Sequence, residues 1–505
     1  MKSYNQIHKN VYRLVMLVVI TATGISCKKS FLDVKPQGTT TATQFWVTSD
    51  DATLAVNAMY ANLRGWTEVA FAPIALESLG SDDTETGSDP SDGSVPFMNT
   101  YNNFSVTSTQ GQLSDFWNGR YQEINLCNQV LDNIPAIAMD VTLKSRYLAE
   151  AKFIRAYEYF RLVRAFGDVP LRLRVPVSAT EYNMPQSPKA TVWAAIEQDL
   201  TDAAGVLPMN YSGADVGRAT KGAALALHAK VAMYQTNTNS AKWVDVKTYT
   251  DQLITGGFGY SLFPNYEQLF RIANENSSES VFEIQAAYIP GNDAASNSQY
   301  SQVQGVRGVT GGGWGFNVPT QNLADEYEPN DPRKDATIIF RGETTPEGDA
   351  IPAAGTNPMF NQKSYVPFGM YVSGPEGSQQ NIRVIRFAEV YLMNAEANNE
   401  LGNTTPALAS LEAVRARARA NSANPATTLP KVTTTDKTAL RNAIWHERRV
   451  ELAMEFDRYF DVIRQGRAST VFGPLGWKAN KNEVWPIPQS EIDLSSGLLK
   501  QNTGY

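Results

Sequence analysis

Histidine is scarce in this sequence, and its scarcity excludes a common class of metalloenzyme. The 505 residues contain three histidines: His8, His228 and His446. The pair His446-Glu447 resembles the start of a zinc-protease helix, but such a helix needs a second histidine one turn later, and Val450 stands there. We therefore predict no metal site and no cofactor.

Cysteine is equally rare, which excludes a disulfide framework. Of the two cysteines, Cys127 lies in a helical pattern and is expected to be a small core residue. Residues 1–26 have a basic start, a short apolar run and small residues at the end, which is typical of an export signal. Cys27 follows directly and is predicted to carry lipid as the first residue of a lipoprotein; ordinary cleavage that leaves a free Cys27 is the alternative.

Basic charge and long apolar runs are missing too. The formal net charge is −7, which argues against nucleic acid as a partner, because phosphates must be neutralised by lysine and arginine. After the signal no segment approaches the roughly 18 uninterrupted apolar residues that a membrane-spanning helix needs.

What the sequence does contain is helical periodicity. Apolar residues recur at helical spacing over 146–164, 191–207 and 218–235, and a helix–turn–helix pattern rich in alanine covers 387–420. The spacing predicts a mainly α fold in which tetratricopeptide-like hairpins stack on one another. We expect an N-terminal helical region, 27–235, and a C-terminal region, 236–505, within one compact unit.

The stretch 443–466 is predicted to be one charged helix with an apolar stripe through Leu452, Phe456 and Ile463. Oppositely charged neighbours three residues apart suggest ion pairs within it. Its arginines are also expected to reach carboxylates on adjacent helices.

Two stretches, 80–101 and 285–380, lose this periodicity and are rich in glycine, asparagine, proline and single aromatics. Long loops in a compact protein are usually functional.

Several motifs together resemble the SusD/RagB family, surface lipoproteins of Bacteroidetes nutrient-uptake systems. The similar segments are SCKKSFLDVKP (26–36), AEAKFIRAYEYFRLVRAFGDVPL (149–171), VPTQNLADEYEPNDPRKDATI (318–338), IRFAEVYLMNAEANNELG (385–402), AIWHERRVELAMEFDRYFDVIRQG (443–466) and VWPIPQSEIDLSSGLLKQNTGY (484–505). The resemblance implies a non-catalytic binding protein, anchored by lipid to the extracellular face of the outer membrane. It also implies an oligosaccharide ligand, or a peptide in some members, and a SusC-like TonB-dependent barrel as partner.

Sugar chemistry selects candidate ligand residues in the loops, since aromatic rings cover sugar faces and polar side chains bind hydroxyls. The candidates are Asp82, Asp83, Asn99, Tyr101, Tyr288, Tyr300, Arg307, Trp314, Phe316 and Asn317. Three glycines, 311–313, would let the backbone approach a ligand closely.

Three alternatives stay open. Asp82 and an acid from 325–335 could form the carboxylate pair of a glycoside hydrolase. Asp82 and Asp83 could bind Ca²⁺ instead. The helices could also serve only to dock a protein partner.

Overall fold

The structure, a computed structural model, describes residues 8, 45–290, 292–368, 370 and 377–505. The predicted signal and the predicted lipidation site, Cys27, lie outside the described residues apart from His8.

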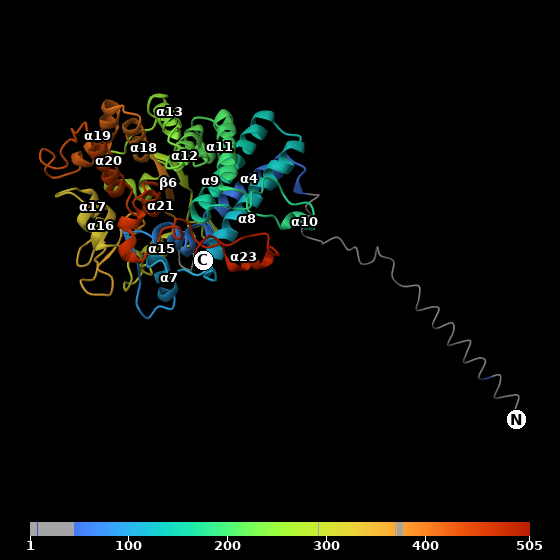
Figure 1. The fold of residues 1–505 in the computed structure, drawn as a ribbon, viewed down its shortest axis with the longest axis horizontal. Coiled ribbons are helices and arrows are strands. Elements are labelled where there is room, and N and C mark those ends of the chain that lie inside the picture. The colour runs from blue at the N-terminus through green and yellow to red at the C-terminus, as the bar shows by residue number, and fades with distance from the viewer. Residues whose placement is uncertain (1–7, 9–44, 291, 369, 371–376) are drawn as a thin grey trace.

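Eight long helices form a continuous array along one side of the molecule (Figure 1). In spatial order they are α8 (Gly111–Asn133), α9 (Val141–Phe166), α11 (Lys189–Val206), α12 (Lys221–Met233), α13 (Lys242–Thr255), α18 (Phe387–Glu400), α19 (Thr404–Ala420) and α20 (Lys437–Leu452). Each helix packs on the next, and α4 (Ser49–Asn62) packs on α8 and α9. The predicted stack of helical hairpins is confirmed.

Local signals explain where the helices of the array begin and end. Asp140 caps α9 by accepting a hydrogen bond from the Leu143 N–H, and Gly167, with φ of 75°, ends it. Thr220 caps α12 in the same way. Helix α11 begins at Lys189, directly after Pro188.

The predicted single helix over 443–466 is wrong. The α20 helix ends at Leu452, and α21 (Arg458–Arg464) begins after a turn in which Met454 and Phe456 have φ of 67° and 68°. No glycine or proline marks this break. The arginines nevertheless reach distant carboxylates as expected: Arg448 pairs with Glu389 of α18 at 2.7 Å.

The side opposite the array is built from short elements (Figure 1). The remaining helices are short: α5 (Trp66–Val69), α6 (Phe71–Pro73), α7 (Val95–Asn102), α10 (Ala179–Tyr182), α14 (Tyr266–Leu269), α15 (Tyr300–Gln304), α16 (Gln321–Glu326), α17 (Arg333–Thr337), α22 (Ala468–Val471) and α23 (Gln489–Leu494). A π-helical turn, Ile74–Ser78, follows α6.

The described residues form three two-stranded antiparallel sheets, two of which join segments that are far apart in the chain. They pair β1 (Thr84–Gly87) with β3 (Phe316–Pro319), β2 (Ser280–Ile284) with β6 (Ile382–Arg386), and β4 (Ile338–Phe340) with β5 (Met359–Asn361). The first pair matters most for function, because Thr84 lies opposite Pro319 and the two loop-rich stretches are thereby brought together.

One large apolar core extends from α4 to the C-terminal residues. Cys127 lies in it, fully buried and unpaired among the described residues, as expected. None of the described helices is both long and apolar enough to cross a membrane.

Candidate functional site

A cluster of aromatic rings forms where α5 and α6 meet the glycine-rich loop before β3. Trp314 stacks on Phe71, with ring centroids 5.9 Å apart and planes at 26°, and lies 6.5 Å from Trp66. Phe316 supports Phe71 edge-on from the buried side. Trp66 is 40% exposed and Trp314 is half-buried, so the cluster offers ring surface to solvent.

Glycines hold Trp314 in this position. The Trp314 N–H donates to the Gln302 carbonyl at 2.7 Å, and the Gly315 N–H donates to the Gly305 carbonyl at 2.9 Å. A Cβ on Gly313 would lie 2.3 Å from that Gln302 carbonyl, so only glycine allows the two segments to lie this close. At Gly313 the close approach is between two protein segments, and close approach of the glycines to a ligand stays a prediction.

Arg307 ties this loop to the 88–92 loop. Its guanidinium contacts Ser88 Oγ at 2.9 Å, Asp92 Oδ2 at 3.0 Å and the Trp314 carbonyl at 3.2 Å. Partial burial raises the pKa of Asp92, but hydrogen bonds from Ser94 and Ser88 and the charge of Arg307 outweigh it, so the pKa is lowered. Asp92 therefore stays ionised and holds Arg307 beside the rings.

One hydrogen bond joins the segment before α5 to Ala294, six residues after Tyr288. The Arg64 guanidinium, two residues before Trp66, donates to the Ala294 carbonyl at 2.7 Å. Tyr288 itself is 53% exposed, so its ring is free to contact a ligand.

The remaining candidates make mostly structural contacts. Asn99 is exposed on α7, away from the rings, and Tyr101 is buried edge-on against Trp485. Tyr300 packs against Phe456, and Asn317 is buried between Ser78 and Gln304. The structure thus gathers Arg307, Trp314 and Phe316 at one place and leaves these four outside it.

Asp82 and Asp83 face arginines. Both Asp82 carboxylate oxygens accept from Arg458 at 2.8 Å, and Asp83, 1% exposed, accepts from Arg449 at 2.8 Å. Arg449 also binds Glu326 at 2.7 Å. Burial alone would raise the pKa of Asp82, but the hydrogen bonds and charges of its arginines outweigh burial, so the pKa of Asp82 is lowered. For Asp83 burial is the larger effect, and its pKa is raised.

These contacts bear on two of the alternatives. Asp82 and Glu326, one of the acids in 325–335, both contact the Arg449 guanidinium, which lies between these two carboxylates. For the Ca²⁺ alternative, the described part of the chain contains no group of three or more His, Cys, Asp or Glu side chains that could hold a metal ion.

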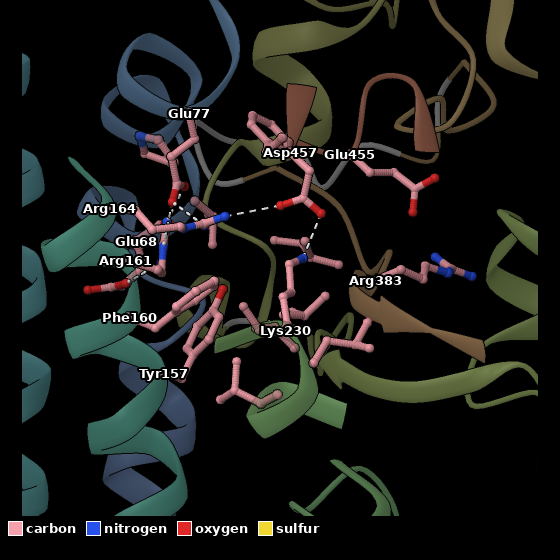
Figure 2. A pocket seen from close by; sticks show the side chains of 18 of the residues that line it. Glu68, Glu77, Tyr157, Phe160, Arg161, Arg164, Lys230, Arg383, Glu455 and Asp457 are labelled. Carbon is pink, nitrogen blue, oxygen red and sulfur yellow. Dashed lines mark hydrogen bonds and ion pairs between the residues drawn. The ribbon is translucent and has the colours of Figure 1, made fainter. Parts of the chain in front are cut away.

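A cavity of about 70 Å³ is lined by Glu68, Val69 and Pro73, from the turn that carries Trp66 and Phe71, and by residues of α9, α12 and β6 (Figure 2). Arg161 of α9 reaches into it and pairs with Glu77 at 2.8 Å and with Glu68 at 3.1 Å. Figure 2 shows Arg164, also of α9, and Lys230 of α12 pointing toward Asp457. Their ion pairs with Asp457 measure 3.1 Å and 2.6 Å. The ion pairs fix the ring-bearing turn to the helical array.

Sequence reasoning missed Trp66 and Phe71. Trp66 follows Gly65 directly, in a break between two helical patterns. A lone aromatic after such a break is the signal that could have drawn attention to it.

Comparison with known proteins decides the family. A profile described as "SusD family" matches residues 278–505, and one described as "Starch-binding associating with outer membrane" matches 30–233. A solved "Laminarin binding SusD-like protein" is 30% identical, with a TM-score of 0.78, over 91% of this chain and 100% of that one. The chain belongs to the SusD family.

Other SusD-like proteins are similar to this chain in sequence or in fold over nearly its whole length. "SusD-like protein P2" of Formosa agariphila is 28% identical over 97% of this chain and 99% of the relative. The surface glycan-binding protein A from Bacteroides thetaiotaomicron, solved with laminarihexaose, shares the fold with a TM-score of 0.75 at 23% identity, covering 90% of this chain and 100% of that one.

Proposed function

We propose that this protein captures oligosaccharides at the cell surface and passes them to a SusC-like TonB-dependent transporter, while lipid on Cys27 holds it at the outer membrane. The observation that carries the proposal is the partly exposed Trp66–Phe71–Trp314 cluster with Arg307 and Asp92 beside it. Rings of this kind bury the C–H faces of a sugar, and the polar rim binds its hydroxyls.

Laminarin-type β-glucan is the first ligand to test, because a relative at 30% identity is named for binding laminarin. Isothermal titration calorimetry with laminarihexaose, cellohexaose, maltohexaose and a peptide mixture tests the class of ligand. Trp314→Ala should weaken binding of the preferred glycan at least tenfold, because it removes a partly exposed ring that contacts both Trp66 and Phe71.

Trp243→Ala is the matched control. Trp243 is also a half-buried tryptophan, but it lies on α13 of the helical array and contacts none of the ring cluster. Glycan binding that survives Trp314→Ala and Trp66→Ala unchanged would refute the assigned site. Heat with peptides alone would favour a peptide ligand, and release of reducing sugar would restore the hydrolase alternative.

A further inference from the structure

A second hollow, of about 220 Å³, lies on the helical array and shares no residue with the Trp66–Phe71–Trp314 cluster. It is lined by the segment 209–218, which connects α11 to α12, and by 258–260, which follows α13. The segment 276–283, which leads into β2, also lines it. The hollow is smaller than the roughly 300 Å³ at which pockets for drug-sized ligands begin, so its natural occupant is small.

Two aromatic rings line this hollow. Phe258 and Tyr260 are parallel to within 3°, with centroids 6.2 Å apart, and both are half-buried. Gly259 between them has φ of 81°, and no atom lies within 4 Å of the place where its Cβ would be. Gly259, which lies between the two aromatic residues in sequence, therefore has no side chain that could block a ligand.

Polar groups with unused hydrogen-bonding capacity surround the rings. The Asn276 amide exchanges one hydrogen bond in each direction with Gln285, at 2.9 and 3.0 Å, which leaves it one N–H and one lone pair. Asn210 is exposed, and its side chain has no hydrogen-bond partner in the described chain. The hydroxyl oxygen of Ser277 is buried and also lacks a partner there.

The charged groups of the hollow are already satisfied. Glu283 accepts from the Asn276 N–H at 3.1 Å and from Asn381 at 2.9 Å. Arg218 pairs with Glu150 at 2.9 Å and with Asp215 at 2.7 Å. With no net charge left to neutralise, the hollow suits a neutral ligand that has apolar faces and several hydroxyls.

We propose that this hollow is a second carbohydrate-binding site, which holds one neutral sugar ring against Phe258 and Tyr260. The class of ligand, a sugar, is taken from the proposed function. The existence of a second site is argued only from the residues that line this hollow.

The test is calorimetry of the full mature chain with laminarihexaose, cellohexaose and maltohexaose, together with hydrogen–deuterium exchange. We expect two binding events per chain with at least one glycan. Trp314→Ala should remove one of them, and Phe258→Ala should remove the other. Bound sugar should protect amides in 209–218 and 256–261, and Phe258→Ala should abolish that protection.

A second variant guards against misfolding, since Phe258 is half-buried. Asn210→Ala changes an exposed side chain and should weaken the second event three- to tenfold while leaving the melting temperature unchanged. If Trp314→Ala abolishes all binding and no sugar protects 209–218, the second site is refuted while the proposed function stands. If Phe258→Ala alone abolishes binding, the second site stands and the Trp66–Phe71–Trp314 site is refuted.

Discussion

Arg307 provides the sharpest test of how the aromatic cluster works, because two roles for it predict different results. In the structure it acts as a positioning residue that ties Asp92 and Ser88 to the Trp314 carbonyl. The sequence-based prediction made it a direct ligand contact. Substituting Arg307 and Asp92 singly and together separates the two roles.

The structure sets the size of the effect. The side chains of Arg307 and Asp92 are 34% and 23% exposed, so their ion pair is worth about 0.2–1 kcal/mol. The hydrogen bond to the Trp314 carbonyl adds about 1 kcal/mol. Arg307→Ala should therefore release the Trp314 loop at a cost of about 1–2 kcal/mol in glycan binding, or about 5- to 30-fold in Kd.

A double-mutant cycle measured by calorimetry gives the answer. If Arg307 acts by position, Asp92→Asn weakens binding by up to about fivefold, and adding it to Arg307→Ala costs nothing more. If Arg307 only contacts the glycan, Asp92→Asn has no effect of its own, or the two effects add to within about 0.3–0.5 kcal/mol, and the positioning argument is refuted.

Three further predictions concern stability and location. Burial lowers the pKa of His228 to about 4, so the native state loses up to about 3 kcal/mol relative to the unfolded state as the pH falls from about 6.5 to 4. His228→Leu should therefore flatten the fall in melting temperature over this pH range. An unchanged slope of melting temperature against pH would contradict the reasoning. Arg164→Met should lower the free energy of unfolding in urea by about 3 kcal/mol, because it leaves buried carboxylates short of a partner, whereas Arg174→Met, at an exposed pair with Glu181, should cost under about 1 kcal/mol. Cys27→Ser should move the protein from the membrane fraction to the soluble fraction, and continued membrane attachment would argue against lipid at this residue.

Periodicity was sufficient to predict most helices of the array, because each buries apolar residues at helical spacing; α13 (Lys242–Thr255) was not predicted. It failed at the break between α20 and α21. The apolar stripe continues in register through Phe456, but the backbone turns there with positive φ at residues that do not favour it. Asp457, just after the turn, is held by Lys230 and Arg164 from two other helices. Contacts that distant in sequence leave no local signal.

The candidate site shows the same contrast between features that have a local sequence signal and features that depend on distant contacts. Trp314 could be predicted because a glycine run exposes a lone aromatic, which is a local pattern. Asp82 and Asp83 looked like free loop carboxylates, since their partners Arg449 and Arg458 lie more than 360 residues further along the chain. Trp66 was missed for the converse reason, because it becomes part of a site only through contact with a ring 248 positions away.

The buried charges explain how such short elements can present a binding surface. α5 and α6 span four and three residues, too few to be stable helices by themselves. Glu68 and Glu77 on this segment bind Arg120 of α8 and Arg161 of α9, so the rings of Trp66 and Phe71 are fixed to the longest helices of the array. A surface held in this way loses little conformational freedom when a ligand binds, and more of the contact free energy remains as affinity. The charges inside the protein thus act on glycan binding indirectly, through the position of two rings.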